Sequence, residues 1–216
     1  MKGYTKPFFT VFFVLLADQL LKFWIKLNMT LGQEYRILGD WGIIHFTENN
    51  GMAFGMELGG EAGKLALSLF RIAAVCVIGY VVIHLVRHKY HRGLILNVSL
   101  IFAGAMGNII DSTIYGVIFS ESTYYEQAQL FPAAGGYSSL FHGKVVDMFY
   151  FPILQGTFPQ WFPFWGGEEF IFFRPVFNLA DAAISVGVVL ILIFQKKYFK
   201  EESVEVSSPH SEIIEE

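Results

Sequence analysis

Two Asn-x-x-Asp pairs in long apolar runs are the first candidates for chemistry: Asn108 with Asp111, and Asn178 with Asp181. Three residues are nearly one helical turn, so the amide and the carboxylate of each pair share a helix face and can meet the same ligand. A carboxylate in hydrocarbon is costly, and by default it marks a functional site with a partner. The rest of the chain must supply that partner.

Helix capping is the alternative interpretation of the second pair. The fourth apolar run starts near Pro175, so Asn178 is suited to an N-cap position and Asp181 to the positive end of the helix dipole. The first pair resists this interpretation, because Asp111 is predicted at a helix C-terminus, where the dipole disfavours a negative charge. Asp111 therefore needs a hydrogen-bond donor or a chemical task.

Three more charged residues belong to the candidate set. Asp147 lies in HGKVVDMFYF among apolar neighbours, where an ionised carboxylate is poorly accommodated. Asp18 and Lys22 are four residues apart in the first apolar run, a spacing that favours a local ion pair and a structural role.

Other catalytic arrangements have less support. The six His residues show no His-Glu-x-x-His spacing, and the single Cys76 excludes a disulfide framework and a multi-cysteine zinc site. The sequence contains no phosphate-binding motif and no basic, aromatic-interleaved patch for nucleic acid. A Ser/Lys pair using Ser138 or Ser139 with Lys144 stays open, but nothing local fixes its geometry.

Membrane-spanning helices must position these residues. Hydrophobic residues make up 54% of the 216 residues and charged residues 16%, and the mean hydropathy of +0.47 is far above that of a soluble domain. A helix needs roughly 20 apolar residues to cross a bilayer. Four segments qualify, at about 8–27, 64–86, 93–111 and 175–195. The predicted fold is an all-α polytopic membrane protein with a few short strands in its long connections.

Basic residues predict the orientation of these spans. They gather before the first span, between the second and third, and after the fourth, at Lys2, Lys6, Arg87, Lys89, Arg92, Lys196, Lys197 and Lys200. The positive-inside rule places these segments and both termini in the cytoplasm. The connections 28–63 and 112–174 are then extracytoplasmic, and the polar groups of the spans fall toward the outer leaflet. Residues 1–200 form one membrane domain, and the acidic tail 201–216 is predicted to be disordered.

Five motifs, in order along the chain, resemble the lipoprotein signal peptidase (signal peptidase II) family of aspartyl proteases of bacterial inner membranes. They are ADQLLK (17–22), NNGMAFG (49–55), GAMGNIID (104–111), KVVDMF (144–149) and FNLADAAI (177–184). The resemblance implies that Asp147 and Asp181 are the catalytic residues. Supporting or substrate-binding residues are then Asn49, Gly51, Asn108, Asp111, Asn178, Asp18 and Lys22.

The resemblance also implies a substrate and a setting. The substrate is a prolipoprotein with a lipobox, cut just before a diacylglyceryl-modified Cys at the outer leaflet of the bacterial cytoplasmic (inner) membrane. The protein is then expected to act as a monomer among membrane lipids, without a metal, an organic cofactor or nucleic acid.

The chain departs from the family pattern in the two outer connections. Ser112 stands where the family usually has Arg, and Arg174 and Lys144 are candidates to supply that charge. An insertion at about 113–143 separates the third span from KVVDMF, and we expect it to contact substrate or membrane outside the catalytic core. The segment 153–173 is longer than is typical and so rich in aromatic residues that it suits the membrane interface.

A pair of neighbouring aspartates has a defined chemistry. Two carboxyl groups within hydrogen-bonding distance hold one proton near neutral pH and titrate as a unit. Asp147 and Asp181 therefore suit acid and base catalysis of peptide hydrolysis by water. The alternative function is a proton- or cation-linked transporter, although polar groups near one face leave no polar path across the membrane. A scaffold whose acids only cap helices is a third interpretation.

Overall fold

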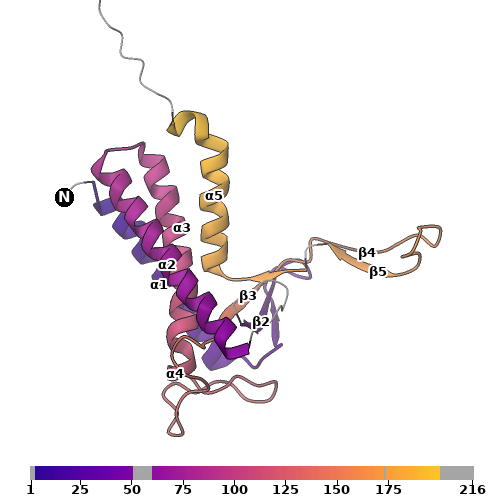
Figure 1. Cartoon of the computed structure of the whole chain (residues 1–216). Coiled ribbons are helices and arrows are strands. Elements are labelled where there is room, and N and C mark those ends of the chain that lie inside the picture. The colour runs from indigo at the N-terminus through magenta and orange to yellow at the C-terminus, as the bar shows by residue number, and fades with distance from the viewer. Residues whose placement is uncertain (1–2, 51–59, 173, 200–216) are drawn as a thin grey trace, which may run out of the picture.

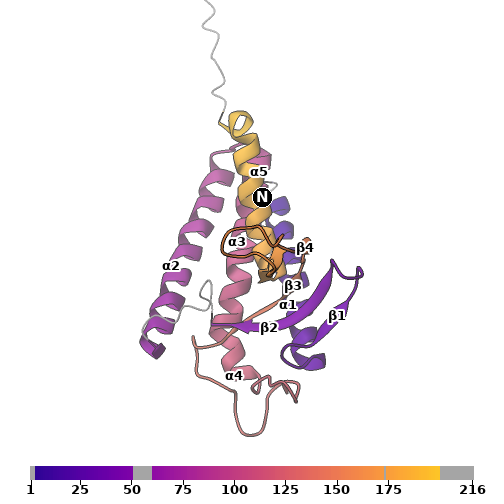
Figure 2. The ribbon, with the colours of Figure 1, turned by 90° about the vertical axis from the view of Figure 1, so that its right-hand side faces the viewer.

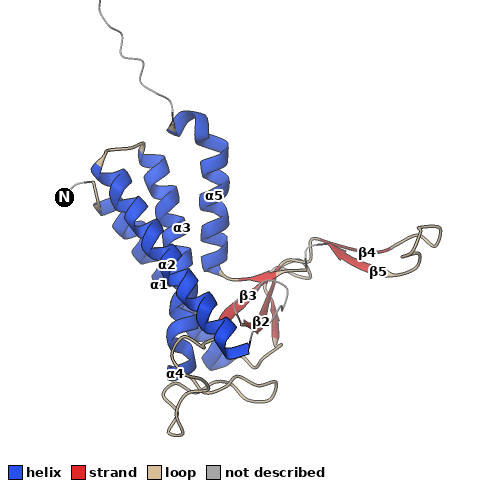
Figure 3. Cartoon of the chain, in the orientation of Figure 1, coloured by secondary structure: helices blue, strands red, loops and turns tan. Residues whose placement is uncertain are grey.

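Four long helices dominate the computed structural model, which describes residues 3–50, 60–172 and 174–199. The helices are α1 (Thr5–Asn28), α2 (Gly60–Arg87), α3 (Arg92–Ile110) and α5 (Leu179–Tyr198). Each contains a segment long and apolar enough to cross a membrane, which confirms the predicted multi-pass membrane protein (Figures 1 and 3). Gly51 and the tail 201–216, both part of the prediction, lie outside the described residues.

Two helix ends differ from the prediction. The third helix does not end at residue 111 but continues through a π-helical turn, η2 (Asp111–Tyr115), into α4 (Gly116–Ile118). Such π-turns are frequent at functional sites. The fourth helix begins at Leu179 rather than near residue 175, because Val176–Phe177 form strand β6 and Asn178 caps the helix.

Small residues allow α3 to pack closely against α5. Among the helices, α3 contacts α1, α2 and α5, and in Figure 2 it lies between α2 and α1. A Cβ added at Gly104 would lie 2.2 Å from the carbonyl oxygen of Ala180 on α5, so only glycine permits this approach. This close packing of α3 against α5 brings Asn108 to the first turn of α5.

An antiparallel sheet lies at the end of the bundle where α5 begins (Figure 1). Its order is β1 (Glu34–Arg36), β2 (Ile43–Asn49), β3 (Val145–Tyr150) and β6. Thr47 on β2 pairs with Asp147 on β3, and Phe149 on β3 pairs with Phe177 just before α5. The sheet therefore fixes Asp147 relative to the start of α5.

The main hydrophobic core lies between this sheet, α1 and the predicted insertion 113–143. Tyr115 and Phe119 of the insertion are fully buried in it. Lys26 of α1 is also fully buried, and its ammonium group donates to Glu48 of β2 and, at 2.9 Å, to Ser122 of the insertion. Part of the insertion thus belongs to the core. Its contact with substrate or membrane stays a prediction.

Strands β4 (Leu154–Thr157) and β5 (Glu169–Phe172) form a separate antiparallel hairpin. This hairpin, called the arm below, projects sideways from the bundle (Figure 1). Its connecting loop exposes large aromatic side chains, with Trp161 at 79% and Phe164 at 94% exposed. The aromatic segment predicted to lie at the membrane interface is therefore an extended arm beside the bundle.

Candidate active site

Asp147 reaches the candidate site from strand β3. The Val146 N–H, one residue earlier, donates to Asp111 Oδ2 at 3.2 Å, so the carboxylate at the start of η2 fixes the strand. Asp147 is buried, with only 5% of the residue exposed. Its Oδ1 accepts a hydrogen bond from Asn178 Nδ2 at 2.8 Å, and its carboxyl group is also hydrogen-bonded by the side chain of Asn49 on β2.

Asp181 reaches the site from the first turn of α5. The Asp181 N–H donates to Asn178 Oδ1 at 2.9 Å, and Asp181 Oδ2 accepts the Asn178 N–H at 3.4 Å, which completes a capping box. The capping interpretation of this pair is therefore confirmed. It leaves a site role open, because Asp181 Oδ1 also accepts from Asn108 Nδ2 of α3 at 2.8 Å.

The amides of Asn108 and Asn178 join the two carboxyl groups. Asn178 Nδ2 donates to Asp147 Oδ1 and, at 3.1 Å, to Asn108 Oδ1, while Asn108 Nδ2 donates to Asp181. Burial, followed by the negative charge of Asp181, raises the pKa of Asp147 to about 7. A carboxyl group with this pKa can hold or release a proton near neutral pH, as acid and base catalysis requires.

Lys22 of α1 connects α1 to α3 next to the amide bridge that Asn108 and Asn178 form. Its buried Nζ lies 3.0 Å from Asp18 Oδ2 and 2.7 Å from Asp111 Oδ2, and it donates to Asn108 Oδ1 at 3.1 Å. The predicted ion pair with Asp18 is confirmed, and Lys22 is also the donor that Asp111 needed. Asp18 in turn accepts the Ala180 N–H of α5 at 3.0 Å. This cluster therefore ties α1, α3 and α5 together at the site.

Gln19 is a further member of the site that the sequence-based prediction lacks. Its Nε2 donates to Asp111 Oδ1 at 3.0 Å, and its Oε1 accepts from the buried Tyr115 hydroxyl at 3.1 Å. The sequence does not single out Gln19, because its partner Tyr115 lies far along the chain, in the insertion. Only the tertiary contact identifies it.

Arg71 of α2 is the second residue absent from that prediction. Its Nη1 lies 3.4 Å from Ser112 Oγ, and its charge acts on Asp181, Asp147 and Asp111. The signal was available, because Arg71 is a single guanidinium in the apolar run 65–86, and an intramembrane charge marks a functional site.

Lys144 and Arg174, the predicted sources of a charge beside Ser112, lie elsewhere. Lys144 Nζ is 3.6 Å from Glu48 Oε2 and 3.4 Å from Glu121 Oε1. Arg174 is exposed between β5 and β6. The Ser/Lys alternative also loses support, because Lys144 faces these carboxylates while Ser139 Oγ contacts His142 Nδ1 at 3.0 Å.

Comparison with known proteins agrees with this geometry. The family model described as signal peptidase (SPase) II matches residues 10–196. The chain belongs to the signal peptidase II family. Members of this family are aspartic peptidases, and the resemblance drawn from the five motifs is confirmed.

Curated relatives cover most of the chain. A lipoprotein signal peptidase of Porphyromonas gingivalis is 56% identical over 181 residues, which are 83% of this chain and 78% of the relative. One from Amoebophilus asiaticus is 36% identical and covers 92% of this chain and 82% of its own length. A bacterial membrane enzyme solved by the in meso method has a fold similar to that of this chain, with a TM-score of 0.58 at 22% identity over 91% of this chain and 92% of that one.

Proposed function

We propose that Asp147 and Asp181 are the catalytic carboxyl pair with which this signal peptidase II removes signal peptides from prolipoproteins. The amide bridge carries the proposal, because Asn108 and Asn178 join both carboxyl groups within one hydrogen-bonded network. The pKa of Asp147, raised to about 7, supports a shared proton near neutral pH. The capping box supports Asp181 as a rigidly held member of the pair.

The pair activates a water molecule for attack on the scissile peptide bond. The ionised carboxylate takes a proton from the water, whose oxygen bonds to the carbonyl carbon, while the protonated carboxyl donates its proton to the carbonyl oxygen. The tetrahedral intermediate then collapses with cleavage of the C–N bond. The leaving nitrogen takes a proton from the carboxyl group that the water had protonated, and one hydroxyl group of the intermediate returns its proton to the other carboxylate. One acid and one base therefore complete hydrolysis without a metal or an organic cofactor.

The other site residues hold this geometry. Asn108 and Asn178 orient the carboxyl groups, and Asn49 of β2 binds the carboxyl group of Asp147. Gly51 belongs to the same supporting or substrate-binding set. The charged cluster of Lys22, Asp18 and Asp111 supports the carboxyl pair by joining α1, α3 and α5.

The site faces the outer leaflet of the bacterial inner membrane. The positive-inside rule supports this orientation, with both termini cytoplasmic. A prolipoprotein presents its lipobox there, where the signal helix ends and the acyl chains of the modified Cys remain in lipid. The cut falls just before that Cys, and the enzyme works as a monomer.

Single and double Asn variants test the pair. Purified Asp147→Asn and Asp181→Asn proteins should each lose on the order of a thousandfold in cleavage of a diacylglyceryl-modified prolipoprotein, because each loses the acid/base couple. The double variant should be hardly worse, since the two groups act as a unit. Asp111→Asn should retain a reduced, measurable rate, on the order of a tenth of wild type, because this carboxylate only supports the site.

Asp40→Asn, at an exposed carboxylate in the β1–β2 turn, is the matched control and should leave turnover unchanged. Thermal unfolding checks that each variant is folded. Substantial turnover by folded Asp181→Asn protein would reduce that residue to its capping role and remove the proposed mechanism. Proton or cation flux through wild-type protein in vesicles, without peptide cleavage, would favour the transporter instead.

A further inference from the structure

Arg71 is a partly buried charge on the helix that otherwise stands apart from the catalytic elements. It is the single Lys or Arg between Leu65 and Val86 of α2. Its guanidinium reaches Ser112 Oγ at 3.4 Å, at the start of η2, and Ser112 Oγ itself donates to the Asn108 carbonyl oxygen at 3.0 Å. Arg71 therefore touches the turn that supports the amide bridge.

A second contact holds this face of α2 toward the site. Ser68, one turn before Arg71, is buried and donates to the Phe141 carbonyl oxygen of the insertion at 2.9 Å. Residues three apart on a helix share a face, so the bond at Ser68 fixes the direction in which Arg71 points. The Phe141 N–H donates to the Thr113 carbonyl oxygen next to Ser112, which connects the insertion to the same turn.

The charge balance of the site explains why a cation is needed there. The charged groups around the pair are Lys22 and Asp18 from α1, Asp111 from η2 and Arg71 from α2. Lys22 faces the two carboxylates of Asp18 and Asp111. Without Arg71, these three residues carry an excess negative charge, which opposes ionisation of the carboxyl pair. A guanidinium stays charged in such surroundings, and it acts here on Asp181 and Asp147.

We propose that Arg71 is a positioning residue of the catalytic site, which steadies the η2 turn through Ser112 and keeps one carboxyl group of the Asp147 and Asp181 pair ionised. It would thus supply from α2 the charge that the family usually places at the position of Ser112. The proposal rests on the catalytic pair proposed above.

Arg71→Gln, Arg71→Lys and the double variant Arg71→Gln/Ser112→Arg test this. Removing the cation should make ionisation of the pair less favourable, so the pH profile of kcat/KM for Arg71→Gln should move by about one unit to higher pH. The rate at pH 6 should fall about tenfold, because fewer molecules hold the singly ionised pair. Arg71→Lys should keep part of the activity, and the double variant should recover activity and profile because the guanidinium returns beside the pair.

Arg87→Gln, at the other end of α2, is the matched control and should behave as wild type. An unchanged pH profile for folded Arg71→Gln would overturn the proposal. So would a loss of rate and thermal stability in Arg71→Gln that is shared by Arg71→Lys and by Arg71→Gln/Ser112→Arg. Asp147→Asn and Asp181→Asn, assayed in parallel, keep the two proposals apart. If both are inactive while Arg71→Gln matches wild type, only the role of Arg71 fails.

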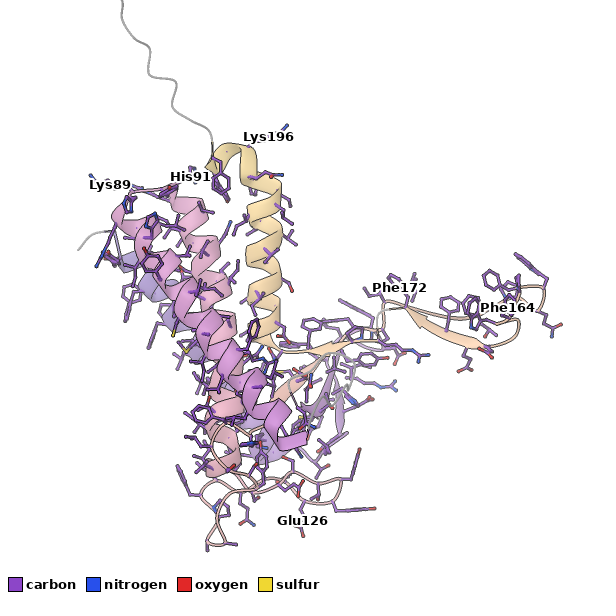
Figure 4. All side chains as sticks on the ribbon, viewed as in Figure 1. Lys89, His91, Glu126, Phe164, Phe172 and Lys196 are labelled. Carbon is purple, nitrogen blue, oxygen red and sulfur yellow. The ribbon has the colours of Figure 1, made fainter. Side chains whose placement is uncertain are left out.

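A separate observation concerns the opposite end of the bundle. A cavity of about 480 Å³ lies between the start of α1 and the turn joining α2 to α3, far along the helices from the carboxyl pair. Three cations line it, Lys6, Lys89 and Arg92, above a floor that includes buried Val86 and Ile95. Figure 4 labels Lys89 at this end. The segments 1–17, 82–110 and 182–199 contain no Asp or Glu, so no acidic residue of these segments offsets the charge.

The backbone at Lys89 is unusual for a residue that has a side chain. Lys89 has a φ of 55°, the left-handed conformation that favours glycine at a helix C-terminus. The Tyr90 N–H donates to the Leu85 carbonyl oxygen and the Lys89 N–H to that of Val86, as in a Schellman motif. A side chain in this conformation is strained relative to glycine.

The geometry points to a binding site for the phosphate headgroup of an anionic phospholipid in this cavity. Three cations suit a phosphate, and the apolar floor at the end of membrane-spanning helices suits the start of the acyl chains. Free phosphate shares the headgroup chemistry but gains nothing from that floor. The volume of the cavity, about 480 Å³, is within the range of small-molecule sites.

Thermal unfolding of the purified full chain, titrated with phosphatidylglycerol, tests this site. Phosphatidylglycerol should raise Tm by a few degrees, whereas phosphatidylcholine and inorganic phosphate should not. The response should vanish in Lys6→Gln/Lys89→Gln/Arg92→Gln protein and persist in Lys196→Gln/Lys197→Gln, which removes two cations at the same end but outside the cavity. Lys89→Gly should raise Tm without lipid, because strain is relieved, and weaken the response to lipid.

Equal loss of the response in both multiple variants would show surface attraction only and overturn the proposal. Equal stabilisation by phosphatidylcholine, or by inorganic phosphate alone, would also contradict it. If the triple variant does not fold, Lys89→Gly and Arg92→Gln remain as single tests, and an unchanged lipid response in both would decide against the site.

Discussion

At the scale of single residues, most polar side chains at the site serve two neighbours. Asn178 caps α5 with its oxygen and binds Asp147 with its nitrogen. Asp111 binds Lys22 and holds the backbone of β3. Buried polar groups are costly unless they are paired, so this double use satisfies many groups with few residues. Substitutions here are therefore expected to alter both stability and chemistry.

The raised pKa of Asp147 predicts a pH dependence of stability. Its folded pKa is about 7, above the ordinary value of 3.8, so the folded protein holds a proton that the unfolded chain has lost between these values. The resulting stabilisation is complete below the ordinary pKa and disappears as pH rises through 7. Asp147→Asn removes this titration, so its Tm should improve relative to wild type as pH rises from 4.5 to 7.5.

Differential scanning fluorimetry across this pH range measures the effect, with exposed Asp40→Asn as the control that should follow wild type at every pH. A Tm difference between Asp147→Asn and wild type that stays constant, or that reverses with rising pH, would contradict the assigned environment of Asp147.

At the scale of elements, α1 is held to the rest of the protein by one polar stripe. Asp18, Lys22 and Lys26 are each four residues apart, and all three are buried. In a membrane helix such a stripe joins neighbouring elements by hydrogen bonds that lipid cannot supply. Here it reaches α3, α5, β2 and the insertion, so α1 is the helix on which the site is assembled.

The arm is predicted to lie in the membrane interface. It leaves the bundle just before α5, at the boundary of the fourth span, and Figure 4 shows Phe164 and Phe172 along it. Trp161 and Trp165 are 79% and 52% exposed, and indole rings favour the headgroup level. With Trp24 and Trp41 replaced by Phe, fluorescence in vesicles should be quenched more by lipids brominated near the headgroup than by lipids brominated mid-chain. Quenching only by aqueous iodide would place the arm in water.

At the scale of the whole molecule, the two ends of the bundle differ in charge. The carboxyl pair and the sheet lie at the end where α5 begins, whereas Lys89 and Lys196 lie at the other end (Figure 4). Lys6 and Arg92 line the same cavity as Lys89. By the positive-inside rule, this separation predicts that the proposed site lies at the outer surface.

Cysteine labelling of intact cells tests this orientation. In a Cys76→Ser background, Phe164→Cys should react with a membrane-impermeant maleimide, because Phe164 is 94% exposed on the arm. Lys89→Cys should react only after the cells are opened. Labelling of position 89 in intact cells would reverse the topology and, with it, the placement of the site at the outer leaflet.

Sequence alone determined the helices and much of the site. Spans are readable because bilayer thickness sets the length of the apolar run, which needs no knowledge of neighbours. The Asn-x-x-Asp pairs and Asp147 were identifiable because charge in an apolar environment is costly wherever it occurs. Capping at Asn178 was also readable, since it depends on residues within one turn of the chain.

Tertiary structure decided which of these groups meet. The bonds from Asn108 to Asp181 and from Asn178 to Asp147 join residues far apart in sequence, and helical periodicity says nothing about such distances. Lys22 was read as the local partner of Asp18, yet it is Asp111 that lies closer, because α1 and α3 pack at that level. Arg71 belongs to the site for the same reason, because α2 packs against α3 and this packing brings Arg71 to Ser112 of η2.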